Sequence, residues 1–270
     1  MADMRFLDRV SVTTEDKLAR VTLDRAGKHN GLDRDMMKAL VQTAHWLRRQ
    51  KDLRAVVVHG AGESFCAGLD FPAMTRRPLR LLGDFFKFGV RDTNLFQKVC
   101  WCWRELPMPV LAVLHGRCYG GGLQIALAAD FRFSTPDCEF SIMEIKWGLV
   151  PDMTGSVTLR ELARIDAVKE LAMTGRVFSG SQALQLGLVS HVMDDPMAGA
   201  EQLAGELLGR SPDAVSACKR LFQDAWAATP QQAFDLESRL QFRLLTGANQ
   251  REAMKANFDK RPPDFRPRKR

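Results

Sequence analysis

The sequence contains no long hydrophobic run and no apolar N-terminal segment. No stretch approaches the roughly 18 consecutive apolar residues of a membrane-spanning helix, so we expect no membrane contact. Residues 1–10 are charged, which predicts that the chain carries no signal peptide and works in the cytoplasm. No internal repeat and no long linker is present. A length of 270 residues with 46% hydrophobic side chains therefore indicates a soluble globular protein with a sizeable core.

Cysteine is scarce and irregularly placed. Six cysteines in a chain of this size do not show the spacing of a disulfide framework. Cys100 and Cys102 form a lone C-x-C with no second Cys or His pair nearby, so we expect buried reduced thiols and no metal site. The sequence also lacks G-K-[ST] and G-x-G-x-x-G, which makes nucleotide hydrolysis and dinucleotide binding poor fits.

Positive charge is in excess and is spread along the chain. The net charge of +7 and the pI near 9.3 favour anionic partners such as nucleic acid, acidic lipid or a phosphorylated cofactor. One short internal cluster has no aromatic stripe beside it, so binding of nucleic acid is disfavoured. It consists of Arg48, Arg49, Lys51 and Arg54. Residues 261–270 are rich in proline and basic side chains, which predicts a disordered, solubilising tail.

Hydrophobic periodicity predicts alternating strands and helices first and helices alone later. Strands are expected at 10–13, 18–23, 55–58, 110–114, 131–134 and 139–140. Helices are expected from the N-cap Asp33 to Arg49, at 92–105, and at 123–129, with 61–90 irregular. The last helices are expected at 197–209, 212–226 and 230–258. The pattern indicates an α/β core over 1–195, C-terminal helices over 196–260 and the tail over 261–270.

Two glycine-bearing segments could bind an anion. Residues 64–70 follow a predicted strand, and their small side chains allow a ligand to approach the backbone, although a plain turn explains them equally well. Gly120, Gly121 and Gly122 open a predicted helix, where unpaired N–H groups and the helix dipole favour negative charge. Such a site can hold a developing oxyanion or a phosphate, and the alternative is a tight strand-to-helix turn.

A third segment, residues 140–152, offers two carboxylates. Glu144 lies among apolar neighbours, and burial would raise its pKa and make it a better base near neutral pH. Asp152 follows eight residues later, beyond a Gly and a Pro that let the chain turn back. The alternative is a surface carboxylate that pairs with Lys146.

These three segments, in this order, resemble the crotonase (enoyl-CoA hydratase/isomerase) superfamily from about Arg5 to Asp194. F-C-A-G-L-D at 65–70 is similar to the family's F-x-A-G-x-D, and P-V-L-A-V-L-H-G-R-C-Y-G-G-G at 109–122 to its P-v-i-A-a-v-x-G-x-a-x-G-G-G. Segments M-T-G-R-V-F-S-G-S-Q-A-L-Q-L-G-L-V at 173–189 and A-A-D-F-R-F-S-T-P-D-C-E-F at 128–140 also match. The resemblance implies a crotonase-type spiral of strand–strand–helix units, closed by C-terminal helices that assemble trimers or pairs of trimers.

The resemblance also implies an acyl-CoA substrate and no metal or redox cofactor. The family's oxyanion hole consists of two backbone N–H groups, which match Leu69 and Gly121. The CoA adenosine end in the family lies along the same loop and an early segment. That places candidate CoA contacts here at Arg25, Lys28, Cys66 and Ala67. Residues 71–95 are expected to shape the acyl pocket.

The acid/base positions depart from those of the family's hydratases, which use two glutamates. Here the first position is Gln124 and the second is Glu144. An amide cannot exchange a proton as a carboxylic acid does, although it could hold a water. The family's isomerases keep mainly the later glutamate, and its dienoyl-CoA isomerases carry an Asp at the spacing of Asp152. We therefore predict double-bond isomerisation of an enoyl- or dienoyl-CoA. The alternatives are 2-enoyl-CoA hydration and a non-catalytic relative that binds acyl-CoA or RNA.

Overall fold

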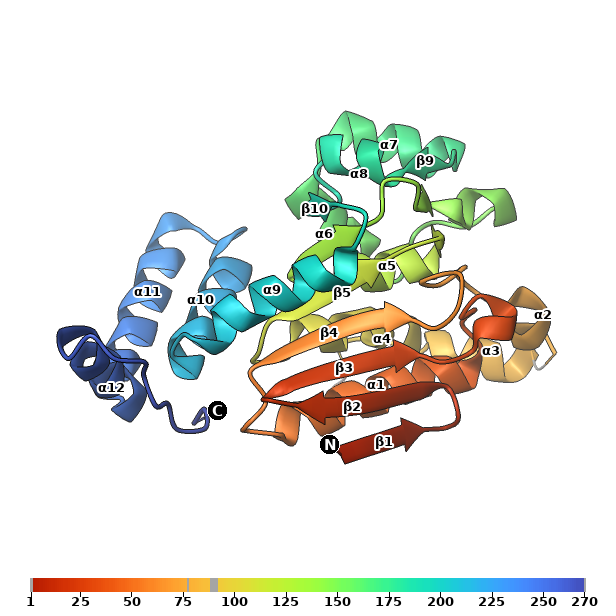
Figure 1. Cartoon of the computed structure of the whole chain (residues 1–270). Coiled ribbons are helices and arrows are strands. Elements are labelled where there is room, and N and C mark those ends of the chain that lie inside the picture. The colour runs from red at the N-terminus through yellow and green to blue at the C-terminus, as the bar shows by residue number, and fades with distance from the viewer. Residues whose placement is uncertain (1, 77, 88–91, 270) are drawn as a thin grey trace.

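The structure is a computed structural model that describes residues 2–76, 78–87 and 92–269 (Figure 1). Its main sheet has seven strands in the order β1-β2-β3-β4-β5-β7-β10. The first three strands are antiparallel, and from β3 onward the neighbours are parallel. The strands are β1 (Ala2–Phe6), β2 (Val10–Glu15), β3 (Leu18–Leu23), β4 (Ala55–Gly60), β5 (Val110–Leu114), β7 (Phe131–Ser134) and β10 (His191–Val192).

A second sheet has three strands, in the order β6-β8-β9. They are β6 (Arg117–Tyr119), β8 (Glu139–Ser141) and β9 (Phe178–Ser179). The chain passes from β5 in the first sheet to β6 in the second through Gly116, whose φ is +57°. A Cβ at this position would lie 1.8 Å from the carbonyl oxygen of Glu63, so only glycine permits the switch between sheets.

Helices cover both faces of the main sheet. The helices before residue 130 are η1 (Ala26–Lys28), α1 (Arg34–Arg49), α2 (Phe71–Met74), α3 (Pro78–Phe85), α4 (Leu95–Arg104) and α5 (Gly121–Leu127). Those after it are η2 (Met143–Trp147), α6 (Gly155–Leu162), α7 (Ile165–Thr174), α8 (Gly180–Gln185), α9 (Pro196–Leu208), α10 (Pro212–Ala225), α11 (Pro230–Leu245) and α12 (Ala248–Phe258). Within the described ranges, none of them is both long and apolar enough to cross a bilayer.

The central strands have buried side chains on both faces, because successive residues of a strand point to opposite sides. Val56 and Val58 of β4 join the larger cluster, which also contains residues of α1, α4 and α5. Ala55 and Val57 of the same strand join the smaller cluster, which includes Ala200 of α9. Figure 1 shows α9 lying across this second face. The core therefore fixes the carboxyl ends of the parallel strands and the loops that leave them.

Most of the predicted elements are confirmed, and the differences have physical causes. The side chain of Asp33 accepts a hydrogen bond from the Met36 amide and caps α1 as expected. Strand β1 was not predicted, and it is ordered by pairing with β2. The stretch 61–90, predicted to be irregular, contains α2 and α3. The prediction of a single helix at 230–258 is wrong, because Thr246 and Gly247 are not helical and separate α11 from α12.

The C-terminal helices α10–α12 lie at one end of the molecule, away from the sheet (Figure 1). One buried ion pair anchors α10 to the core. The Lys219 ammonium lies 2.7 Å from the Asp130 carboxylate and also donates to the carbonyls of Trp103 and Met108. A lysine buried this deeply requires such partners, because an unpaired charge is costly away from water.

The basic tail is packed on the protein, which corrects the expectation of disorder. Arg268 is 2% exposed, and its guanidinium donates to the carbonyls of Arg48, Gln50, Lys51 and Leu53, where α1 ends. A cation at this position satisfies carbonyls that a helix end leaves free and complements the helix dipole. Arg54 donates to the carbonyls of Leu208 and Phe265. The composition of the tail did not reveal these backbone acceptors.

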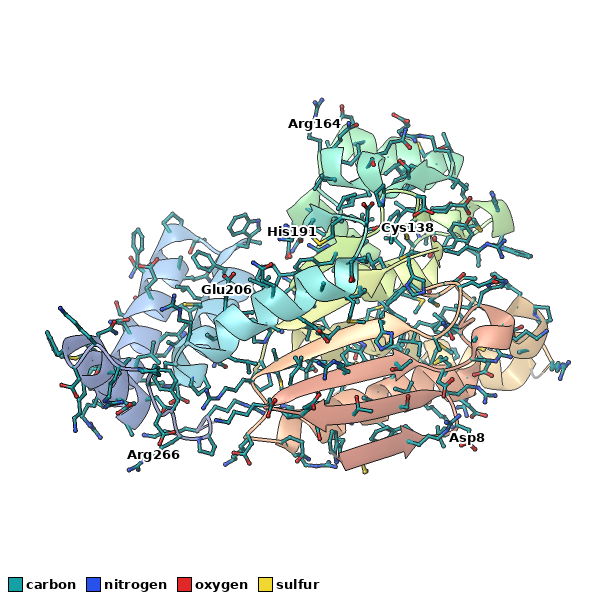
Figure 2. The ribbon with its side chains drawn as sticks, in the orientation of Figure 1. Asp8, Cys138, Arg164, His191, Glu206 and Arg266 are labelled. Carbon is teal, nitrogen blue, oxygen red and sulfur yellow. The ribbon has the colours of Figure 1, made fainter. Side chains whose placement is uncertain are left out.

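Replacing Arg268 by Met should lower the free energy of unfolding by about 2–4 kcal/mol, because charged hydrogen bonds to buried carbonyls are lost. The matched control is Arg266→Met. Arg266 is exposed at the molecular surface (Figure 2), and its side chain makes no hydrogen bond within the described residues. That variant should stay within about 0.5 kcal/mol of the parent. Equal denaturation midpoints for the two variants would show that the tail does not hold α1.

Candidate active site

The three segments singled out in the sequence meet at one cavity of about 210 Å³. The loop after β4, the start of α5, and η2 with the loop after it form its walls. The lining residues are Ala67, Gly68, Leu69, Phe71, Phe85, Phe96, Gly120, Gly121, Met143, Glu144, Trp147, Leu149, Val150, Asp152 and Met153. The predicted positions Leu69, Gly121, Glu144 and Asp152 are therefore brought together, although up to 83 residues separate them in the sequence.

Two backbone N–H groups at this cavity have no partner in the described part of the chain. Leu69 forms an isolated parallel bridge with Leu32, in which Gly68 accepts from Leu32 and Asp70 donates to it. The N–H of Leu69 itself therefore points to the opposite side of that extended backbone. Gly121 is the first residue of α5, where a helix leaves its N–H groups unpaired. Two donors of this kind suit an oxygen that gains negative charge.

Close backbone approach holds these two donors at the same wall. A Cβ at Gly68 would lie 2.9 Å from the carbonyl oxygen of Tyr119 and 3.8 Å from the nitrogen of Gly121. Gly120 precedes α5 with a φ of +49°, and its N–H donates to the Ser141 carbonyl. A side chain at Gly68 would therefore displace the backbone at Tyr119, and the left-handed conformation of Gly120 is strained for any other residue.

Glu144 is the partly buried carboxylate of the site, so its predicted alternative as a surface partner of Lys146 is wrong. Its Oε1 accepts a 2.6 Å hydrogen bond from Nε2 of Gln124. Its Oε2 is buried, with no hydrogen-bond partner among the described residues. Burial raises the pKa of Glu144, the hydrogen bond from Gln124 opposes this, and the charge of Asp152 adds to it. Oε1 of this carboxylate is thus held by Gln124, whereas Oε2 is available to accept a hydrogen bond or a proton.

Gln124 is buried, and both the oxygen and the nitrogen of its side-chain amide form hydrogen bonds with other groups of the protein. The side chain is 2% exposed. Its Oε1 accepts from the amides of Met153 and Gly155, each at 2.9 Å, while Nε2 donates to Glu144. Its oxygen already accepts two protein donors, so the expected water would have to be held by the remaining hydrogen of Nε2.

Asp152 is a second acidic group that lines the cavity. Burial raises the pKa of its carboxyl. Its ionised form also disfavours ionisation of Glu144, so the two groups titrate under each other's influence. A carboxyl that keeps its proton to a higher pH than usual can act as a proton donor.

The predicted CoA contacts divide into reachable and unreachable groups. Cys66 is fully buried, its Sγ donates to the Asn30 carbonyl, and burial raises its pKa to about 12, which excludes direct contact with a ligand. Ala67 lines the cavity. Lys28 is exposed at the end of η1, next to His29, whose carbonyl accepts a hydrogen bond from the Ala67 amide. Arg25 is engaged by the protein, 2.8 Å from Asp70 and 2.9 Å from the Gly31 carbonyl. Arg25 therefore ties the early segment to the loop that carries Leu69.

Aromatic side chains form much of the apolar wall, which motif matching alone does not reveal. The rings of Phe71 and Trp147 stack with centroids 4.1 Å apart, and those of Phe85 and Phe96 at 4.4 Å. Phe71 and Phe85 belong to the stretch expected to shape an acyl pocket. Trp147 lies outside that stretch and was missed; its position three residues after Glu144 was the available signal.

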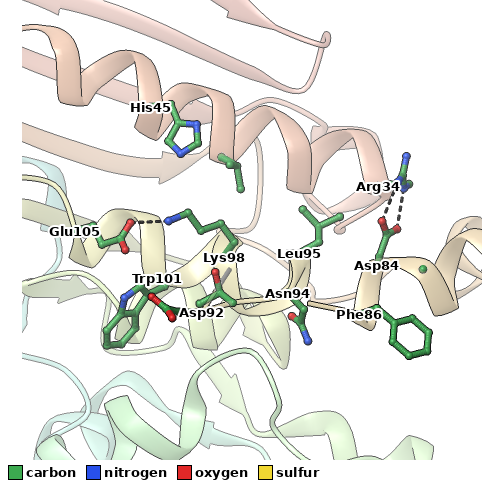
Figure 3. Close-up of a pocket in the computed structure, with 13 residues that line it drawn as sticks. Arg34, His45, Asp84, Phe86, Asp92, Asn94, Leu95, Lys98, Trp101 and Glu105 are labelled. Atoms are coloured by element: carbon green, nitrogen blue, oxygen red, sulfur yellow. Dashed lines mark hydrogen bonds and ion pairs between the residues drawn. The ribbon is translucent and has the colours of Figure 1, made fainter. Parts of the chain in front are cut away.

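A larger cavity of about 830 Å³ lies between α1, α3 and α4 (Figure 3), and four of the charged groups that line it form two ion pairs. Arg34 binds Asp84 through two hydrogen bonds of 2.7 and 2.8 Å. Lys98 lies 2.6 Å from Glu105. Figure 3 shows that the two side chains of each pair point toward one another. The smaller cavity, with its unpaired carboxylate oxygen and free N–H groups, is therefore the candidate active site.

Comparison with known proteins shows which proteins this chain resembles. The enoyl-CoA hydratase/isomerase family profile matches residues 13–268. The chain is 30% identical to the enoyl-CoA hydratase EchA19 of Mycobacterium tuberculosis over 92% of each chain. It is 34% identical to the mitochondrial Delta(3,5)-Delta(2,4)-dienoyl-CoA isomerase of Mus musculus, over 78% of this chain and 68% of that one. A crystal structure of an enoyl-CoA hydratase from Polaromonas sp. JS666 superposes with a TM-score of 0.85 at 27% identity, covering 95% of this chain and 99% of that one.

The pair Arg25–Asp70 should be energetically coupled, because both side chains are mostly shielded from water at 18% and 15% exposure. Arg25→Gln and Asp70→Asn, made singly and together, should give a coupling free energy of about 1 kcal/mol in a double-mutant cycle of urea unfolding. Additive effects of the two substitutions would mean that the pair does not hold the loop.

Proposed function

The chain belongs to the enoyl-CoA hydratase/isomerase family of the crotonase superfamily, and we propose that its cavity moves a carbon–carbon double bond in an enoyl- or dienoyl-CoA. The observation that carries this proposal is the state of the two acid/base positions. Gln124 occupies the first and cannot exchange a proton, while Glu144 at the second keeps one oxygen free beside the cavity. One base on one face suffices for a proton shift along an acyl chain.

The proposed reaction begins with the thioester oxygen bound by the N–H groups of Leu69 and Gly121. Glu144 Oε2 removes a proton from C2, and the electron pair of that C–H bond moves into the thioester to form an enolate. The two N–H groups stabilise the negative charge that develops on the oxygen. The protonated Glu144 then returns its proton at C4, or at C6 of a dienoyl chain, and the double bond shifts. The reaction has no net uptake of protons or electrons, so it requires no metal or redox cofactor.

Asp152 favours a second candidate function. Two carboxylates at one cavity could hold a water between them, and addition of that water across a 2-enoyl-CoA would be a hydration. One relative named a hydratase and one named a dienoyl-CoA isomerase resemble this chain at similar identity, 30% and 34%. We place isomerisation first because Asp152 occupies neither glutamate position of the hydratases.

We also propose that the protein works as a homo-oligomer assembled through α10–α12. Large apolar side chains stand exposed on these helices and, for Trp226, directly after α10. They are Phe222, Trp226, Phe234, Phe242, Leu245, Met254 and Phe258. A nucleic-acid partner remains disfavoured, since Arg54 is occupied by carbonyls and the Arg268 side chain lies against the end of α1.

Glu144→Gln should reduce turnover of 3-enoyl- or dienoyl-CoA by about 10²–10⁴-fold, because the base is removed. Acyl-CoA binding, measured by calorimetry, should stay within a few-fold. Glu63→Gln is the control, since Glu63 is exposed and does not line the cavity. If Glu144→Gln retains more than about a tenth of the parent turnover, Glu144 is not the base.

The turnover rate should rise with pH through an apparent pKa above the ordinary Glu value of 4.5, because only ionised Glu144 accepts a proton and burial raises its pKa. Asp152→Asn removes a negative charge that raises the pKa of Glu144. The acidic limb of the pH–kcat profile of this variant should therefore lie at lower pH than that of the parent. A pH–kcat profile of the two proteins measures both effects. An unshifted limb in Asp152→Asn would contradict the coupling.

Hydration and isomerisation are separated by incubating the parent protein with 2-enoyl-, 3-enoyl- and dienoyl-CoA in deuterated water. Mass spectrometry should find shifted double bonds and little 3-hydroxyacyl-CoA. Deuterium should enter the product only to the extent that the proton held by Glu144 exchanges with solvent before it returns. Hydration of a 2-enoyl-CoA at a typical enzyme turnover, on the order of 10 s⁻¹ or above, would replace the isomerase proposal by the hydratase.

A further inference from the structure

Gln124 is buried at the site yet cannot carry a proton, and its contacts assign it a different task. We propose that Gln124 is a positioning residue whose amide decides which oxygen of Glu144 carries the proton. This inference rests on the proposed role of Glu144 as the base, and it adds the device that orients that base. It depends on three observations: the orientation of the amide, the donor that faces Glu144, and the unpartnered oxygen of Glu144.

The backbone at the start of α6 fixes the orientation of the amide. Thr154 has a left-handed conformation, with a φ of +75°, so the N–H groups on either side of it converge. Both meet Oε1 of Gln124, from Met153 and from Gly155. An amide turned the other way would place its NH₂ group against two N–H donors. The oxygen therefore faces α6, and Nε2 faces Glu144.

Glycine at position 155 is part of this arrangement. A Cβ there would lie 2.8 Å from Oε1 of Gln124 and 3.1 Å from Cβ of Pro151. A left-handed conformation is also strained for a β-branched residue such as Thr154. Strained residues persist where surrounding contacts determine them, and they gather at functional sites. Here the strain places two donors on one amide oxygen.

The donor that faces Glu144 acts in both protonation states of the carboxyl. Nε2 offers only hydrogens, so Oε1 of Glu144 must accept, whether the group is charged or neutral. A proton taken from substrate therefore resides on Oε2, the oxygen with no protein partner among the described residues. The same oxygen takes the proton and returns it, and the hydrogen bond to Gln124 persists throughout. Such pre-organisation avoids rearrangement during the reaction.

The other ionisable groups that face Glu144 do not compete for this role. Asp152, from the loop before α6, raises its pKa through charge. Burial keeps the thiol of Cys100 on α4 neutral by raising its pKa well above the ordinary value, and the charges of Asp152 and Glu144 act in the same direction. Lys146 of the same 3-10 helix is exposed. Among the side chains of the described ranges, the amide of Gln124 is thus the one that donates a hydrogen bond to Glu144.

Two variants remove the device in different ways. Gln124→Leu deletes the donor, and Gly155→Ala keeps Gln124 but places a methyl group where its oxygen lies. Each should lower kcat on the order of 10²-fold and leave KM within about threefold, as misplacement of a reacting group does. The acidic limb of the pH–kcat profile should move to higher pH, because the hydrogen bond that lowers the pKa of Glu144 is lost.

Gln124→Glu is the conservative rescue. A protonated carboxyl at position 124 can donate to Oε1 of Glu144 as the amide does, and two carboxylates at this spacing share one proton. This variant should keep turnover within about tenfold of the parent while the pair holds that proton. Its turnover should fall at higher pH as the proton leaves, giving an alkaline limb that the parent lacks. Sustained activity of Gln124→Leu, or loss of activity in Gln124→Glu at every pH, would overturn the proposal.

A titration without substrate separates this proposal from the proposed function. Protein labelled with ¹³C at glutamate side-chain carboxyls reports the pKa of Glu144 by NMR, with Glu144→Gln identifying the signal. Gln124→Leu should raise that pKa, and Gln124→Glu should show two coupled titration steps. An unchanged titration in both variants would refute the positioning role even if isomerisation is observed. The expected shifts together with no isomerisation would support the role and reject the function. If Gln124→Leu does not fold, Gly155→Ala and Gln124→Glu decide.

Discussion

Close approach of two backbone segments is the constraint on which the site depends. The loop at 64–68 lies against β6 and the start of α5, where Cys66 and Cys118 form a parallel bridge. A Cβ at Gly122 would lie 2.5 Å from the Cys66 carbonyl oxygen, and one at Gly68 would lie 2.9 Å from that of Tyr119. Because only glycine allows this approach, the N–H groups of Leu69 and Gly121 reach one cavity wall. The helix that begins there then carries Gln124 into the core.

The site is organised by which polar atoms the protein pairs and which it leaves free. Nearly all buried polar groups of a folded protein are hydrogen-bonded, so an exception at a cavity is informative. The amide of Gln124 is bonded at both ends, whereas Oε2 of Glu144 and two backbone N–H groups are unpartnered in the described residues. These three free groups are one carboxylate oxygen and two donors. That combination fits removal of a proton beside a carbonyl whose oxygen becomes negative.

The C-terminal region is attached to the core by a few buried cations rather than by a continuous apolar interface. Lys219 pairs with Asp130, and Arg268 binds the carbonyls at the end of α1. Apolar side chains on α10–α12 meanwhile remain exposed. These exposed side chains support the proposal that another copy of the chain covers the helices.

Local sequence signals were enough to place many secondary-structure elements and the residues of the cavity, because turn chemistry, capping and hydrophobic period act over a few residues. Asp33 caps α1, the glycines open α5, and the family motifs located Leu69, Gly121 and Glu144. Contacts between distant segments decided the rest. The packed tail, the engagement of Arg25 by Asp70 and the burial of Cys66 all involve partners far away in the sequence. The role of Gln124 belongs to the same group: its three hydrogen-bond partners lie 20 to 31 positions away, beyond the reach of any local pattern.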